Sequence, residues 1–553
     1  MNKPLLLSLA AAALLGTNLN AESMYDRIQA MELEMNKMKQ EITTLKAEKS
    51  TGDEDEEESD VAADDEESGV TEDDEESKDT DSDEDDDDNE EEDDEEDEEM
   101  DVQEEIRDIH ETITDLNKAT NGNKLKFGVD YRFAVENLNY EMADGTKAKN
   151  DAFMTNRFWM NMSWSATKNL SFKGQLAYNK AFGQRSGVSP QAGGLESFDW
   201  IANENAYDDT LRLRSAYFLY KDSEFLGAGI PWTFSVGRRP STNGHLVNLR
   251  DDDPEASPMG HTINVEFDGL SAKFGLEKLI GADGMYVKLC AGRGMSNAQP
   301  MFAQTGTPYA TDDSTNPDID LIGLIFVPYN NGHYSLSTQY YYANNLIDSE
   351  YDNAMNPTGR FNTVGGLHSV TANIKIDGIG NDWSDFLDDT IFFVSGAMSI
   401  TDPNSGYDVY NAAGAYQRTD VGMLGSADAE TGYSVWVGLQ VPSLITEDGR
   451  WGLEWNQGSQ YWRSMTYGED TNIGSKLAAR GDAYEAYFTE YLVEDILSMQ
   501  IRYTYIDYKY SGSNGFFGNT SGTPTEISGN MGGMQSRVVD KAQDIRFYLR
   551  YKY

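Results

Sequence analysis

The chain has 553 residues, with 97 Asp and Glu against 43 Lys and Arg, and a single cysteine. Its longest nearly apolar run, residues 5–15, is about half of the ~20 residues that a membrane-spanning helix needs, so we expect no helical membrane protein. The lone Cys290 excludes a disulfide framework, a multi-cysteine metal cluster and covalent haem attachment, and we expect neither metal nor cofactor. The net charge of -54 argues against nucleic acid as a partner, because phosphate binding is driven by Lys and Arg.

Residues 1–21 predict a secretory signal peptide. Lys3 gives the positive start, residues 5–15 form the apolar stretch, and Asn20-Ala21 offers a small-residue cleavage site. The sequence therefore predicts export from the cytoplasm.

Residues 22–50 predict a short coiled-coil helix, and residues 102–118 predict a second one. Apolar residues recur at alternating spacings of four and three, the pattern of a helix seam. They are Met24, Ile28, Met31, Met35, Met38, Ile42 and Leu45, then Val102, Ile106, Ile109, Ile113 and Leu116. Isoleucine at both seam positions favours three strands, which predicts a homotrimer. The methionine-rich first seam is weak, so a single amphipathic helix against the membrane or barrel is the alternative.

Residues 51–101 hold 35 of the acidic residues and one basic residue, Lys78. Such a charge density cannot be buried, so we expect a disordered acidic linker that extends by self-repulsion. Weak collective binding of Ca²⁺ or Mg²⁺ is the alternative, although no 12-residue calcium loop with a central glycine is present.

From residue 123 to 553 the apolar period changes to two, which predicts β-strands with one apolar and one wet face. In the first strand Leu125, Phe127 and Val129 alternate with Lys126, Gly128 and Asp130. The last strand places Ile545, Phe547 and Leu549 on one face and ends on the aromatic Tyr553. Long and short connections alternate between the strands. A soluble β-sandwich or β-helix is the alternative, but the combination favours a transmembrane β-barrel.

The connections predict sixteen antiparallel strands, with eighteen as the alternative. Eight connections are long, the first over residues 137–151 and the third over 240–259. The number of strands is even, as expected for such a barrel, only if residues 261–278 form one strand. Its apolar phase slips between Phe267 and Leu270, so we predict a β-bulge at Asp268-Gly269.

These features resemble the sixteen-stranded porins of Gram-negative outer membranes over residues 123–553. A coiled coil before a trimeric barrel also resembles sugar-specific porins. More closely, the run VGRRPSTNG at residues 236–244, with Ser257-Pro258 and the run FDGL at 267–270, looks like an uncharacterised porin-like outer-membrane family. The resemblance implies a barrel in the outer membrane, with the N-terminal segment in the periplasm, but no particular solute. The coiled coil and the acidic linker could reach towards the cell wall, so we expect possible cell-wall contact. The acidic linker departs from both patterns.

The polar phase of the first five strands and the last strand is rich in cations. It predicts one continuous basic wall in the pore. Its residues are Lys126, Arg132, Arg157, Lys173, Arg212, Arg214, Arg239, Arg546 and Arg550, with Lys552 in the same phase. Only Asp130 and Asp544 oppose them there. Plain solvation of a polar lumen is the alternative.

The loop after the fifth predicted strand carries Asp251, Asp252, Asp253 and Glu255. In the porins that the chain resembles, the loop at this position folds inward and sets carboxylates opposite a basic wall. If this carries over, a transverse field crosses the constriction and sorts solutes by charge. A solvated outer loop is the alternative.

The remaining aromatic and histidine residues favour no enzyme. Tyr340 to Tyr342, Tyr503 and Tyr551 fit interfacial girdles, whereas Trp159, Trp436 and Tyr548 have the inward phase. None of the five histidines stands in a recognisable catalytic motif. We therefore predict a passive outer-membrane channel for small hydrophilic solutes or ions, in contact with lipid. A structural or adhesive barrel tethered towards the cell wall is the alternative.

Deleting residues 22–118 should leave the barrel able to fold and insert but weaken the trimer, because the heptads lie in that segment. Cross-linking and native electrophoresis of the full and shortened chains in detergent would test this. A shortened barrel that fails to insert, or that is equally trimeric, contradicts the prediction.

Overall fold

The computed structural model describes residues 125–183, 211–295, 318–351, 357–380, 383–404, 409–410, 416–417, 422–466, 471–512, 522–528 and 538–553. All of them belong to one compact unit, Asp93–Tyr553. The predicted signal peptide, both coiled-coil segments and the acidic linker lie outside the described residues. No helix within the described residues is long and apolar enough to span a membrane.

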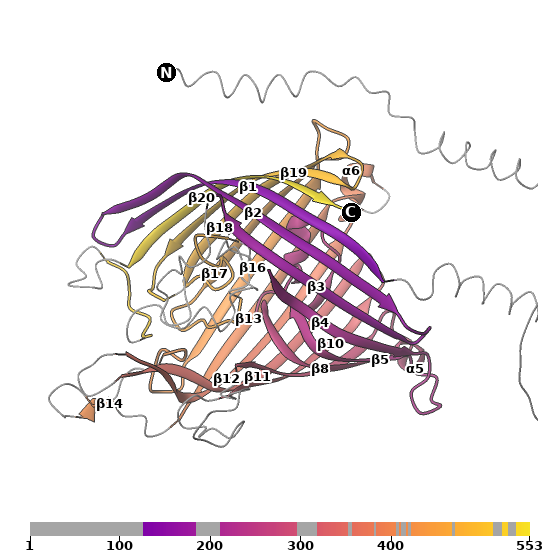
Figure 1. Ribbon diagram of the computed structural model, residues 1–553, viewed down its shortest axis with the longest axis horizontal. Coiled ribbons are helices and arrows are strands. Elements are labelled where there is room, and N and C mark those ends of the chain that lie inside the picture. The colour runs from indigo at the N-terminus through magenta and orange to yellow at the C-terminus, as the bar shows by residue number, and fades with distance from the viewer. Residues whose placement is uncertain are drawn as a thin grey trace, which may run out of the picture. The chain divides into compact units, whose positions relative to one another are not determined.

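Sixteen antiparallel strands form a closed barrel, as the sequence predicted (Figure 1). Each strand pairs with its neighbour along the chain, and β1 pairs with β20 to close the ring. The strands are Lys126–Met142 (β1), Lys147–Ser165 (β2), Leu170–Ala181 (β3), Arg212–Asp222 (β4), Trp232–Ser241 (β5), Val265–Gly275 (β8), Tyr286–Met295 (β9), Ile319–Asn330 (β10), Tyr334–Tyr351 (β11), Pro357–Asp377 (β12), Ile391–Pro403 (β13), Thr431–Pro442 (β16), Arg450–Gly458 (β17), Gly481–Val493 (β18), Leu497–Tyr508 (β19) and Val539–Lys552 (β20).

Short elements lie in the connections. The helices α5 (Glu277–Ile280) and α6 (Asp385–Asp388) lie at the end of the barrel that also holds the C-terminus, which we call the turn end (Figure 1). The opposite end, the loop end, carries the pair β14 (Val409–Tyr410) and β15 (Tyr416–Gln417). Between β5 and β8 come β6 (Gly244–His245), the 3-10 helix η2 (Val247–Asp251) and β7 (Ala256–Met259).

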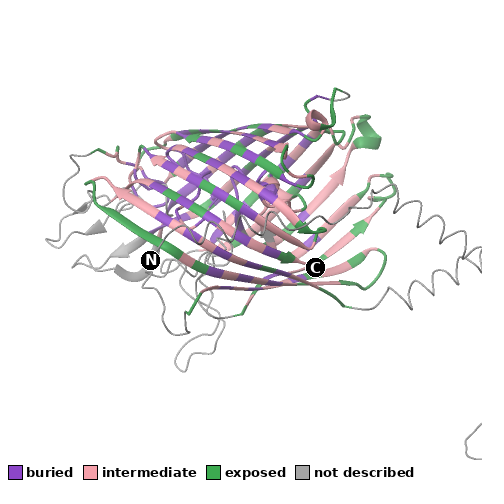
Figure 2. Ribbon diagram, turned by 90° about the horizontal axis from the view of Figure 1, so that it is seen from above, coloured by how far each residue is buried: buried purple, intermediate pink, exposed green. Residues whose placement is uncertain are grey.

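Burial alternates along each strand because neighbouring side chains point to opposite faces of the wall (Figure 2). On β20, Arg546, Tyr548 and Arg550 point inward and are buried, whereas Ile545 and Tyr551 point outward and are exposed. A closed ring satisfies every ladder hydrogen bond, which an apolar surrounding requires.

Two details of the predicted strand assignment are wrong. The strand β8 keeps a continuous register with both β5 and β9, so no bulge interrupts it at Asp268-Gly269. The apolar phase changes because Phe267 is buried inside the barrel while Leu270 is exposed outside it. The connection predicted over residues 137–151 is instead a tight turn, since β1 runs to Met142 and β2 begins at Lys147.

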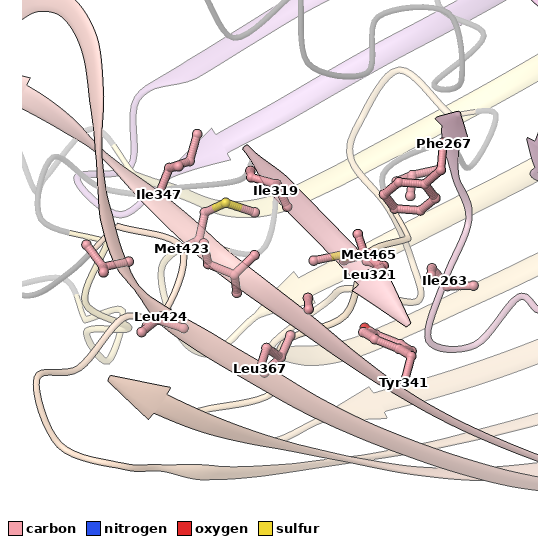
Figure 3. Close-up of a cluster of buried hydrophobic side chains, with 14 residues drawn as sticks. Ile263, Phe267, Ile319, Leu321, Tyr341, Ile347, Leu367, Met423, Leu424 and Met465 are labelled. Atoms are coloured by element: carbon pink, nitrogen blue, oxygen red, sulfur yellow. The ribbon is translucent and has the colours of Figure 1, made fainter. Parts of the chain in front are cut away.

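An apolar cluster inside the barrel explains the inward phase of Phe267 (Figure 3). Phe267, Leu321 and Tyr341 from the wall pack against Ile263 and Met465, which belong to connections rather than to barrel strands. The buried inward position of Tyr341 also removes it from the predicted outer girdle, although its neighbour Tyr340 is exposed on the outer face. Part of the lumen is therefore filled by protein.

Candidate functional site: the barrel lumen

The connection between β5 and β8, residues 242–264, folds into the barrel, and we call it the first inward loop. It leaves the wall early because β5 and β8 have only 10 and 11 residues, against 21 in β12. Its two short strands pair in parallel, Gly244 with Ala256 and His245 with Met259. A Cβ atom on Gly244 would lie 2.0 Å from the Pro258 carbonyl oxygen, so only glycine allows this close pairing.

Side chains of the opposite wall hold the first inward loop. The Asn373 amide oxygen on β12 lies 2.9 Å from His245 Nε2, and the Gln440 amide on β16 donates to the Leu249 carbonyl. His261 is fully buried, 2.8 Å from Ser395 Oγ and 2.9 Å from Ser434 Oγ. Burial lowers the pKa of His261 to about 3, so the ring is neutral and serves as an anchor.

The predicted constriction carboxylates lie on the part of this loop that reaches the far wall. Asp251 accepts a hydrogen bond from Tyr548 at 2.9 Å, and Arg550 lies 2.9 Å from Asp253. Lys552 also pairs with Asp253, at 2.8 Å. We expected carboxylates that face a basic wall across a gap, but these two instead bond directly to β20.

The other two carboxylates go to different partners. Asp252 lies 3.1 Å from Arg450, at the start of β17. Glu255 is exposed, and its Oε1 lies 3.0 Å from His245 Nδ1. Among the four predicted carboxylates, Glu255 therefore pairs within the loop, while the other three bond to wall residues.

A second connection lies between β17 and β18, and its described residues, 459–466 and 471–480, also fold into the barrel; we call them the second inward loop. Its described residues pair with the first loop, since Asn264 N–H donates to the Met465 carbonyl at 2.6 Å. Leu477 packs with Leu246 of the first loop and with Trp436 of the wall. No pattern in the sequence predicts that this loop lies inside the barrel.

Both inward loops meet at one buried carboxylate, that of Glu485 on β18. Arg250 of the first loop lies 3.4 Å from it, and Lys476 of the second loop pairs with it as well. Thr504 donates to its other oxygen at 2.8 Å, and Arg502 lies 3.9 Å away. Lys476 also reaches Glu454 on β17, at 2.7 Å. Each charge in this cluster has an opposite charge beside it, which its burial requires.

The predicted basic wall falls into two groups. Arg132, Arg157 and Arg550 lie side by side in the register of β1, β2 and β20, and all three are buried. Asp130 pairs with Arg550 at 2.6 Å and with Arg157 at 3.3 Å, while Arg546 pairs with Glu136 at 2.7 Å. This group is compensated by carboxylates.

The second group lies on β3, β4 and β5. Arg214 is buried 4.3 Å from the Trp159 ring, which also carries Arg157 at 3.5 Å. Arg239 lies half-buried 5.0 Å from the Tyr217 ring. In the same group Arg212 is half-buried and Lys173 is exposed. The last predicted residue, Lys126 on β1, is also exposed, near the turn end.

Exposure divides the lumen into a filled side and an open side. On β13 and β16–β20 many inward side chains lie under the two loops and are at most 2% exposed, as for Ser395, Ser434, Trp436, Asn456, Gln500, Thr504, Asp544 and Tyr548, whereas Arg450 and Lys552 near the turn end are partly exposed. On β2–β9 several inward side chains reach solvent, namely Asn161, Lys173, Tyr217, Arg239, Lys273 and Tyr286. Solvent inside the barrel therefore lies along β2–β9, where the charged inward side chains of this set are cationic.

Sequence reasoning missed the buried acids Glu136, Glu454 and Glu485. They have the inward phase of their strands, so a census of acids in that phase would have found them. Among the described residues no group of three His, Cys, Asp or Glu side chains is arranged to hold a metal ion. The roles of the predicted wall and loop residues in a pore stay predictions.

Comparisons with known proteins found one matching protein family and several similar solved structures. The family described as Protein of unknown function (DUF3373) matches residues 147–553. No curated protein matches the chain. OmpT of Vibrio cholerae is 11% identical over 78% of this chain and 97% of that chain, with a TM-score of 0.39. OprB of Pseudomonas putida is 13% identical over 80% and 96%, with a TM-score of 0.41. The anion-selective porin from Comamonas acidovorans is 10% identical over 78% and 100%, also with a TM-score of 0.41.

Removing the Glu485 carboxylate should destabilise the barrel, because Arg250, Lys476 and Arg502 would remain buried with less opposite charge. We expect Glu485→Ala to lower the free energy of unfolding by about 3 kcal/mol. Urea unfolding in detergent micelles measures this. On the same strand Asp482 pairs with Lys509, which is about half exposed, so Asp482→Ala is the control and should cost less than about 1 kcal/mol. Equal losses would contradict the account.

The environment of Glu255 predicts that the stability of the folded barrel depends on pH. Its side chain is 44% exposed, and the partial desolvation inside the barrel would alone raise its pKa, but His245, Lys375 and Lys273 bring the pKa below the ordinary value of 4.5. Glu255 therefore stabilises the folded barrel above pH 4.5, and this contribution is lost as the pH falls through the folded pKa.

The measurement is the thermal midpoint of wild type and Glu255→Gln between neutral and acidic pH. The variant should be less stable at neutral pH and should match wild type once Glu255 is protonated. Glu447→Gln, in an exposed turn, is the matched control. A difference between wild type and Glu255→Gln that persists unchanged into acid contradicts the assignment.

Proposed function

We infer that this chain, which belongs to the DUF3373 family of proteins of unknown function, is an outer-membrane channel through which small hydrophilic solutes or ions diffuse passively, with a preference for anions. The observation that carries the proposal is the divided lumen. One side is filled by the two inward loops, and the other leaves a solvent-exposed strip along β2–β9.

A membrane location is supported by the outer face of the closed wall. Outward side chains such as Phe127, Leu289, Ile322, Ile501 and Ile545 are large, apolar and exposed. A soluble protein would expose such a band to water, whereas in a bilayer it faces lipid. The closed ring of strands leaves no unpaired edge in that apolar environment.

Anion preference is supported by the charges that border the open strip. Lys173 is exposed there, and Arg239 and Lys273 are half-buried. The carboxylates of Asp251, Asp252 and Asp253 are paired with wall residues on the filled side, as are those buried on β17–β20. Glu255 is the carboxylate of this loop that acts on a cation of the strip, Lys273. Low-dielectric walls focus the field of such a strip on the water beside it. Anions would concentrate there, and cations would be repelled.

The preference does not depend on the total charge of the chain. The acidic linker holds most of the -54, whereas salt limits the field at any point mainly to charges within ~10 Å of it. Selection therefore depends on the charges that a solute passes at the constriction. Lipid around the barrel and a homotrimer built on the predicted heptads complete the proposal.

A structural or adhesive barrel is the second candidate. It is favoured by the amount of protein inside the barrel, since two loops pack against most of β11–β20. The two candidates differ in one property: the channel conducts ions and the structural barrel does not.

The test is single-channel recording of the purified full chain in planar bilayers under a salt gradient. We expect steady conductance steps and a reversal potential of the sign that indicates anion preference. Replacing Lys173→Glu and Arg239→Glu together should move the reversal potential towards cations, because both side chains border the open strip.

Lys149→Glu, combined with Lys147→Glu, is the matched control. Both residues are exposed in the hairpin between β1 and β2, and the change in charge is the same. The control should shift the reversal potential much less. Cation preference in wild type would overturn the anion proposal, and silence from an inserted barrel would favour the structural alternative.

A further inference from the structure

A pocket lies between the first inward loop and the wall formed by β5 and β8–β11. It leaves about 670 Å³ free of protein atoms, a volume that includes open solvent. Ser257, Pro258 and Ile263 of the loop form one side. The pocket lies on the inner face of the barrel wall, because the wall residues Phe267 and Ile325 that line it point inward and are buried.

One end of the pocket is cationic. Lys288 is 8% exposed and donates to Ser257, while Arg239 donates to Ser235 and Ser271. Neither cation is within ion-pairing distance of any carboxylate that the structure describes. Two further cations lie close enough to act electrostatically on Lys288, namely Arg239 and Lys273. Positive charges gathered in a partly desolvated site are stabilised by a bound anion.

The rest of the pocket is apolar. Ile263, Phe267, Leu321, Ile325 and Tyr341 line it, and all of these except Ile325 belong to the buried apolar cluster that packs beneath the loops (Figure 3). An apolar body of a few carbon atoms gains free energy by entering such a site. A fully hydrated inorganic ion would leave this surface unused.

Glycines keep the wall of the pocket free of side chains. Gly269, Gly292 and Gly323 have the inward phase on β8, β9 and β10 and line the pocket together. Gly292 lies opposite Gly269 and Gly323 lies opposite Cys290 in the strand register. A Cβ atom on Gly323 would lie 3.3 Å from the Tyr340 carbonyl oxygen, a tight contact that a shift of a few tenths of an ångström would relieve, and a larger side chain would project into the pocket.

We propose that this pocket binds a small organic anion with an apolar body, such as an aromatic or short-chain carboxylate, with its oxyanion at Lys288 and Arg239 and its apolar part against Phe267 and Ile325. The inference deepens the proposed channel function, because the pocket opens on the same lumen. It narrows the solutes from anions in general to amphipathic carboxylates.

Cys290 allows a direct test, because it is the single cysteine of the chain, lines the pocket and is partly accessible. The full chain in detergent is treated with 2-sulfonatoethyl methanethiosulfonate, which is anionic, or with its trimethylammonium counterpart. We expect faster labelling by the anionic reagent. Benzoate should slow the labelling. Neutral benzamide should need a concentration at least about tenfold higher for the same effect, because the amide lacks the charge-assisted contact.

Lys288→Met should weaken the protection by benzoate by about tenfold or more. Lys375→Met, which removes an inward cation of β12 outside the pocket, is the matched control and should leave the protection unchanged. If Lys288→Met does not fold, Gly323→Leu gives an independent test, because it fills the pocket and keeps both cations. It should abolish the protection by benzoate.

The outcomes separate the pocket from the channel. Labelling that benzoate does not slow, or that is faster with the cationic reagent, overturns the pocket, whatever the conductance. A thiol that reacts with neither reagent overturns it too, because no solute could then reach the site. Protection by benzoate in a barrel that conducts no ions keeps the pocket and overturns the channel.

Discussion

The buried carboxylate of Glu485 is the contact on which the internal structure of this barrel depends. Arg250 reaches it from the first inward loop and Lys476 from the second, while Arg502 and Thr504 approach it from the neighbouring strand. A buried carboxylate is costly to desolvate, so it persists only with such partners around it. One acid therefore attaches two loops, far apart in sequence, to the same wall.

This attachment decides which part of the lumen stays open. With both loops held against this wall, most inward side chains of β13 and β16–β20 are buried, and solvent remains along β2–β9. The acids of the loop tip are paired with Arg550, Lys552 and Arg450 on the filled side. The cations of β3, β5 and β8 then determine the field in the open strip, so ion selection follows from where the loops are anchored.

The sequence predicted the barrel well, because strand period and connection lengths are local signals. It gave the number of strands, the inward phase of Arg132 and Tyr548, and the unusual third loop. It missed the second inward loop, since Trp462 and Leu477 are apolar residues without a period, and only their contacts with distant strands show that they are buried. It also placed a bulge near Phe267, because a fully polar lumen was assumed where the loops create an apolar one.

The central claim is that one side of the lumen is filled and the other is open, and thiol accessibility measures this most directly. In a Cys290→Ser background, Lys173→Cys on the open side and Thr504→Cys on the filled side would be labelled with a membrane-impermeant methanethiosulfonate. The account predicts fast labelling at position 173 and protection at position 504. Equal, rapid labelling at both positions would show that the loops do not fill the barrel and would contradict the account.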